Sequence, residues 1–110
     1  MVVVIFEVEP KPGRVPDYLD MAAALKADLA QTDGFISIER FASLTNPDKI
    51  VSLSFWRDEA AVARWRAQER HRRAQVRGRG ELFADYRISV AAVLRQYGMN
   101  DRAQAPQPWP

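Results

Sequence analysis

The first extended segment of the chain is apolar on both of its faces. Residues 2–6 read Val-Val-Val-Ile-Phe, and β-branched and aromatic side chains favour strands. Successive side chains of a strand point to opposite faces, which gives two sets here: Val2, Val4, Phe6 and Val8 against Val3 and Ile5. A sheet with one face in water alternates apolar and polar residues instead. We therefore expect this strand in a sheet that is covered on both faces.

The next segments predict a helix and a hairpin. Residues 10–13 (Pro-Lys-Pro-Gly) break the strand, and Pro16 suits the first turn of a helix. Apolar residues then recur at helical spacing until Asp33-Gly34 ends the pattern: Tyr18, Met21, Ala22, Leu25 and Leu29. Extended segments follow at 35–44 and 50–57, and the turn-forming residues 45–49 join them as a hairpin.

The second helix is expected to be short and broken. Asp58 is a suitable N-cap for a helix over 59–66. The positions that share a helix face with Trp65 are all polar (Gln68, Glu69 and Arg72). The loss of amphipathicity predicts a break at 67–69 and a second short helix over 70–77. A last, largely apolar strand is expected over 83–97.

The order β-α-β-β-α-β is that of the ferredoxin-like α+β fold, an antiparallel sheet with both helices on one face. The predicted strands at both ends of the chain and at 50–57 carry apolar residues on both faces. The simplest cover for the second face is another copy of the chain, so we expect a homodimer. We assign residues 1–98 to one domain and residues 99–110 to a Pro-rich C-terminal tail.

Composition excludes several classes of site. The 110 residues include no cysteine, which removes disulfides, thiolate catalysis and zinc–cysteine sites. One histidine without spaced ligands does not suggest a metal site. The start resembles no signal peptide and no apolar run is long enough to span a bilayer, so a cytoplasmic protein without a membrane partner is expected.

His71 and Trp65 are the candidates for chemistry. His71 is the single histidine, and histidine is the side chain that titrates near neutral pH and serves as general acid or base. Six residues correspond to about 120° around an unbroken helix, so Trp65 and His71 share a face only if the helix breaks. The alternatives are a hydrogen-bonded core histidine and a tryptophan that only anchors the core.

Arginines cluster between residues 64 and 79 while the net charge is only +2. A basic run of this kind can follow a phosphate backbone. No nucleic-acid motif accompanies it, so a solvated helix face is the preferred interpretation and a nucleic-acid partner is not expected.

Taken together, a set of motifs resembles the antibiotic biosynthesis monooxygenase (ABM) family of dimeric α+β barrels. The resemblance covers about residues 1–98. The segments that carry it are Gly34-Phe35-Ile36-Ser37, Glu39-Arg40-Phe41, Ser52-Leu53-Ser54-Phe55-Trp56, Asp58-Glu59, Trp65, His71, Gln75, Gly78-Arg79, Tyr86-Arg87 and Tyr97-Gly98. It implies a homodimer with a cavity in each subunit between the sheet and the helices.

The resemblance brings two chemistries. One is cofactor-independent oxygenation of phenols, for which quinone-forming members use a tryptophan, an asparagine four residues before it and a tyrosine six residues after it. Here Trp65 matches, Ala61 replaces the asparagine and His71 replaces the tyrosine. The other is haem degradation, for which Phe6 and Gln75 stand where an asparagine and the axial histidine are expected, so it is disfavoured.

The leading hypothesis is a monooxygenase without cofactor or metal that acts on a small phenolic or quinol-type compound. His71 would be the general base and Trp65 a pocket wall, with Phe41, Phe55 and Tyr86 as further substrate-binding residues. The alternative is a non-catalytic small-molecule-binding or stress-response protein with the same fold, because a fold does not fix a function.

Overall fold

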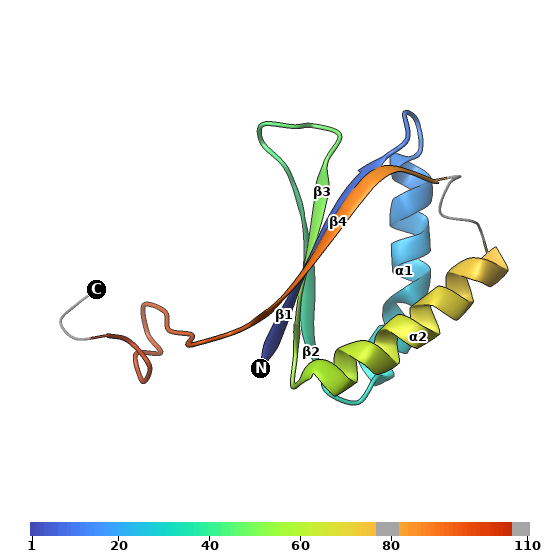
Figure 1. The fold of residues 1–110 in the computed structure, drawn as a ribbon. Helices are drawn as coiled ribbons and strands as arrows, with labels where there is room; N and C mark the ends of the chain where they lie inside the picture. Colours follow the sequence, from blue (N-terminus) through green and yellow to red (C-terminus); the bar gives the residue numbers. More distant parts are fainter. Residues whose placement is uncertain (77–81, 107–110) are drawn as a thin grey trace.

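A computed structural model describes the backbone of residues 1–76 and 82–106 and the side chains of residues 1–68 and 82–106. Along the chain the elements are β1 (Val2–Pro10), α1 (Val15–Gln31), β2 (Phe35–Ala42), β3 (Ile50–Trp56), α2 (Glu59–Val76) and β4 (Phe83–Ala92). The expected order β-α-β-β-α-β is confirmed (Figure 1).

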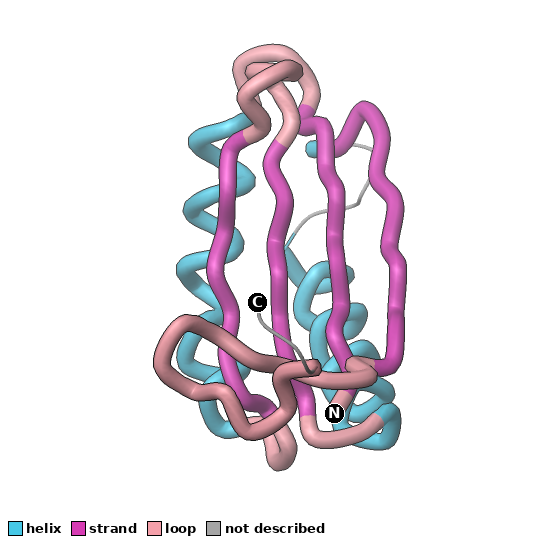
Figure 2. Tube along the Cα trace, turned by 90° about the vertical axis from the view of Figure 1, so that its left-hand side faces the viewer, coloured by secondary structure: helices cyan, strands magenta, loops and turns pink. Residues whose placement is uncertain are grey.

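The strands form one antiparallel sheet in the order β2-β3-β1-β4. Both helices cover the same face of this sheet, which we call the inner face, and leave the outer face without a helix (Figures 1 and 2). The two-sided strand β1 lies between β3 and β4. This is the ferredoxin-like arrangement that the sequence predicts.

Alternating positions along the strands point their side chains to the inner face. Val2 and Val8 of β1 are buried, and β3 alternates strictly between buried and partly exposed positions from Ile50 to Trp56. The core on this face has two clusters. One surrounds Trp56 and Trp65, and the other surrounds Val8, Tyr18 and Phe83.

Helix α1 forms as its apolar repeat predicts. Pro16 lies in its first turn, and the guanidinium of Arg14 contacts Asp17 at 2.8 Å. The buried face is Tyr18, Ala22, Leu25 and Leu29.

Gly34 lets α2 approach the end of α1 closely. Its φ angle is +90°, a conformation that suits glycine. A Cβ atom at this position would stand 2.5 Å from the Cβ of Ala61, which is fully buried. The side chain of residue 61 therefore packs directly on the backbone of Gly34, and a side chain much larger than alanine would not fit there.

Helix α2 contradicts the predicted break. It runs as one helix from Glu59 to Val76, so neither the end at residue 66 nor a second helix over 70–77 is correct. Its start is as predicted, because the N–H of Ala61 donates to Asp58 Oδ1 at 2.9 Å. This hydrogen bond, with a smaller effect of Arg57, lowers the pKa of the Asp58 carboxyl.

Two strands differ from the prediction. β2 ends at Ala42 and β4 at Ala92, short of the expected residues 44 and 97. An irregularity in the pairing between Phe35 and Ser37 turns the ring of Phe35 to the inner side, where Phe35 and Ile38 both pack on the core. Regular alternation along a strand would place these two residues, three positions apart, on opposite faces of the sheet.

The segment after β4 leaves the domain. It projects away from the outer face of the sheet (Figure 1), and the radius of gyration, 15.9 Å, exceeds the value of about 13 Å for a compact domain of this size. Local contacts order the segment, for example Arg102, which donates to the carbonyl of Gly98 and lies 5.4 Å from the ring centre of Tyr97. Within the described residues, no helix is both long and apolar enough to cross a membrane.

Candidate functional site

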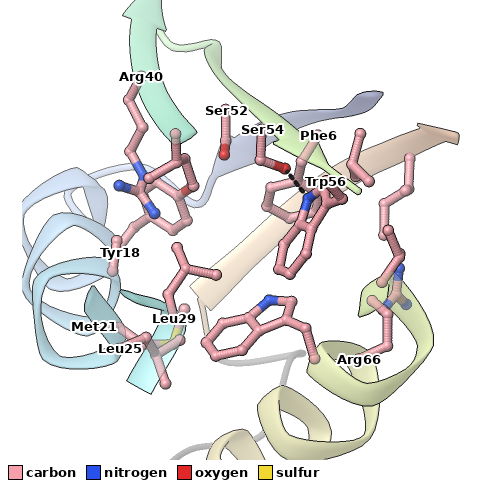
Figure 3. A pocket seen from close by; sticks show the side chains of 16 residues that line it. Phe6, Tyr18, Met21, Leu25, Leu29, Arg40, Ser52, Ser54, Trp56 and Arg66 are labelled. Carbon is pink, nitrogen blue, oxygen red and sulfur yellow. Dashed lines mark hydrogen bonds between the residues drawn. The ribbon is translucent and has the colours of Figure 1, made fainter. Parts of the chain in front are cut away.

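A pocket lies between the inner face of the sheet and the two helices (Figure 3). The space that the centre of a water molecule can occupy is about 70 Å³, and all free space around it, including open solvent at the mouth, is about 680 Å³. All four strands and both helices contribute side chains to the lining: Val4, Phe6, Tyr18, Met21, Ala22, Leu25, Leu29, Ile38, Arg40, Ser52, Ser54, Trp56, Val62, Trp65, Arg66 and Ile88.

Two tryptophans form an aromatic wall of this pocket. The ring centres of Trp56 and Trp65 are 6.4 Å apart, and Phe35 packs edge-on against Trp56 at 5.3 Å. The indole N–H of Trp56 donates to the hydroxyl of Ser54 at 2.9 Å (Figure 3). Trp56 is thus fixed by its own sheet, and it forms with Trp65 an aromatic wall whose two ring planes are inclined by 33°.

The polar part of the lining is basic. Among the lining residues whose side chains the structure describes, two are arginines and two are serines, and none is an aspartate or glutamate. Arg40 comes from β2 and Arg66 from α2, on opposite sides of the pocket in Figure 3. The Nε of Arg40 is buried and has no hydrogen-bond partner among the described residues.

The structure places the expected substrate-binding residues in three different surroundings. Trp65 lines the pocket. Phe41 and Phe55 do not, which corrects the prediction, because they pair with Val51 and Val3 on the outer face of the sheet. Tyr86 is on the inner side of β4, where its ring centre is 5.8 Å from that of Phe6, a lining residue, but Tyr86 itself is outside the lining.

His71, the expected catalytic residue, lies on the continuous helix α2, but its side chain is outside the described part of the structure. In an unbroken helix the positions of Trp65 and His71 are about 120° apart around the axis and about 9 Å apart along it. The break that was to bring them onto one face does not occur. Ala61, at the position of the family's asparagine, packs against Gly34 and is not a lining residue.

Sequence reasoning missed Arg40 as a pocket residue, although a signal for it was present. Arg40 lies two residues after Ile38 and two before Ala42, so alternation along a strand places all three on one face. An arginine among apolar residues of one strand face is unusual and suggests that it has a partner. Among the described residues, no cluster of His, Asp or Glu side chains suits a metal ion.

Comparisons with known proteins agree with this geometry. The model of the family described as "Antibiotic biosynthesis monooxygenase" matches residues 1–77. A curated relative, "Jasmonate monooxygenase ABM" of Pyricularia oryzae, is 43% identical over 101 residues, which are 92% of this chain and 47% of the relative. The chain thus spans about half the length of that relative.

Two solved structures show the same fold. Rv0793 from Mycobacterium tuberculosis superposes with a TM-score of 0.74 at 24% identity, over 88% of this chain and 98% of that chain. PA3566 from Pseudomonas aeruginosa superposes with a TM-score of 0.72 at 21% identity, over 86% of this chain and 94% of that chain. At these identities the likeness supports the fold alone.

Proposed function

Because the chain belongs to the antibiotic biosynthesis monooxygenase family, we propose that it is a monooxygenase that oxidises a small, largely apolar molecule in the pocket between sheet and helices. The substrate class that we propose first is a phenol or quinol. The observation that carries the proposal is the pocket itself, which is walled by Trp56 and Trp65 and opens to solvent.

The proposed reaction uses O₂ and needs no prosthetic group. A phenolic substrate that loses a proton becomes electron-rich enough to pass an electron to O₂. For an anthrone, the methylene carbon becomes a carbonyl: one oxygen atom enters the product, and the other leaves as water with the two hydrogen atoms of the methylene group. The protein would bind the ring, exclude bulk water and handle the proton.

Within the pocket Trp65 would hold the plane of an aromatic substrate, since offset stacking and edge-on contacts between rings are favourable. His71 is the proposed general base. Its place beyond Trp65 on the same helix puts it toward the end of α2, so it would act on the part of a substrate that extends past the tryptophan wall.

The proposal is tested by oxygen uptake of the purified protein with a panel of anthrones, hydroquinones and jasmonate, the last because it appears in the name of the curated relative. We expect at least one compound to be consumed with O₂ above the rate in buffer. For an anthrone, mass spectrometry should show a product that has gained one oxygen atom and lost two hydrogen atoms. Uptake that never exceeds the buffer rate would count against a monooxygenase.

The same assay tests the role of His71. General bases contribute about 10²- to 10⁴-fold to a rate, so His71→Ala should slow oxygen uptake by about this factor. Arg70→Ala should not, because position 70 lies about 140° from Trp65 around the same helix. If both variants consume O₂ as fast as the parent, His71 is not the base.

A non-catalytic binding protein is the second candidate, and the packing of Ala61 favours it. No side chain at 61 reaches the pocket to orient a substrate as an amide would. Haem degradation remains disfavoured, since Phe6 lines the pocket at the position of the first-strand asparagine. Ligand-induced quenching of tryptophan fluorescence without any oxygen uptake would identify the binding protein.

We also propose a second copy of the chain as partner. On the outer face, apolar side chains of three strands adjoin one another and none is covered by a helix: Val3, Ile5, Phe41, Val51, Leu53 and Phe55. The segment after β4 projects on this same side (Figure 1). Sedimentation equilibrium should give the mass of two chains, and Leu53→Lys should shift it toward one. A parent that sediments as one chain at all concentrations would contradict a dimer.

A further inference from the structure

Arg40 is the least satisfied polar group of the pocket. Its Nε is buried without a hydrogen-bond partner in the described structure, and no ion pair of Arg40 is seen there. The residue as a whole is partly exposed, but a buried N–H without a partner has lost its hydration without compensation. The ordinary partner of the Nε edge of arginine is a carboxylate, which takes two parallel hydrogen bonds.

A hydroxyl accompanies this guanidinium. Ser52 is the cross-strand partner of Arg40 and is buried. In Figure 3 its hydroxyl points into the pocket from the same side as Arg40. The hydroxyl of Ser54 accepts the indole N–H of Trp56, which ties it to the tryptophan wall. No hydrogen bond of the Ser52 hydroxyl is seen among the described residues, so both groups are available to a ligand.

Among the described lining residues, no side chain is a counter-ion for this positive charge. These residues include two arginines, no aspartate or glutamate, and otherwise mainly apolar side chains. The apolar residues nearest in sequence and register to this corner are Ile38 on β2 and Phe6, which also pairs with Ser52. Arg40 and Ser52 thus form a polar corner in a pocket whose other described lining residues are mainly apolar.

We propose that the substrate of this pocket is an amphiphilic monocarboxylate, whose carboxylate binds Arg40 and Ser52 and whose apolar body lies against Trp56 and Trp65. The inference rests on the proposed function, because it narrows the substrate of the same pocket to molecules that carry a carboxylate, which include phenols and quinols with a carboxylate group. Two oxygen atoms match the Nε edge of Arg40 better than the single oxygen of a phenolate does. A neutral ligand would seal the guanidinium away from water without a partner, so the pocket selects against esters.

The test is equilibrium binding measured by calorimetry without O₂. The probes are jasmonate and 1-naphthylacetate, each with its methyl ester, and 1-naphthol. The variants are Arg40→Gln, Arg40→Lys and, as a matched control in the same pocket, Arg66→Gln. Thermal melts verify that each variant is folded.

Hydrogen bonds to charged groups correspond to about 10- to 100-fold in affinity. We expect at least one acid to bind the parent about 10-fold or more tighter than its ester. Arg40→Gln should remove this preference, Arg40→Lys should restore part of it, and Arg66→Gln should keep it. The proposal is overturned if neither acid binds, if an ester or 1-naphthol binds the parent as tightly as the acids, or if the preference survives in Arg40→Gln or disappears equally in Arg66→Gln.

Failure of this subsite and failure of the proposed function give different results. Acids that bind through Arg40 but never raise oxygen uptake leave the carboxylate site intact and contradict the monooxygenase. Oxygen uptake with neutral phenols, together with esters that bind as well as acids, contradicts the carboxylate site and leaves the monooxygenase intact.

Discussion

Trp56→Ala is expected to lower the free energy of unfolding by about 3–5 kcal/mol, the usual cost of truncating a large aromatic residue in a core. Trp56 is 1% exposed and joins the sheet to α2 through its contact with Trp65. Its removal opens a cavity beside Phe35 and leaves the hydroxyl of Ser54 without the indole N–H. Thermal denaturation should show a melting temperature lower by about 10 °C or more.

Trp56→Phe is the matched control, because it keeps a ring in the core and loses only the second ring and the N–H donor. It should fall between the parent and Trp56→Ala. A Trp56→Ala protein that melts within about 3 °C of the parent would show that the tryptophan pair does not hold the sheet to α2.

Local patterns were sufficient for most of the fold. The apolar residues on both faces of β1 indicate a strand, and the apolar repeat of α1 indicates a helix. The order of these elements and the hairpin leaves few possible topologies. The prediction of a broken α2 is wrong because loss of amphipathicity does not by itself end a helix. No glycine or proline occurs between residues 59 and 76, and glutamine, glutamate and arginine are good helix formers. Loss of amphipathicity in a run of such residues therefore does not end a helix.

The site was partly predictable. Alternation along β3 places Trp56 on one face with Ser52 and Ser54, and Phe55 on the other face. The pocket role expected of Phe55 came only from its membership of a family motif. The irregularity at Phe35 has no signal in the sequence, because it depends on how β2 pairs with β3. Arg40 was visible in the sequence as a charge among the apolar residues of one strand face. That its Nε is buried without a partner among the described residues required the tertiary structure.

Oxygen consumption by Ala22→Phe and Ala23→Phe tests most directly whether turnover occurs in the pocket. These neighbours on α1 are matched, since Ala22 is buried in the pocket lining and Ala23 is exposed. A ring at 22 would fill part of the pocket at a cost of about 1–3 kcal/mol in stability. With the best compound of the panel, Ala22→Phe should remain folded and consume O₂ only at the buffer rate, while Ala23→Phe matches the parent. A folded Ala22→Phe that consumes O₂ at the parent's rate would contradict a reaction in this pocket.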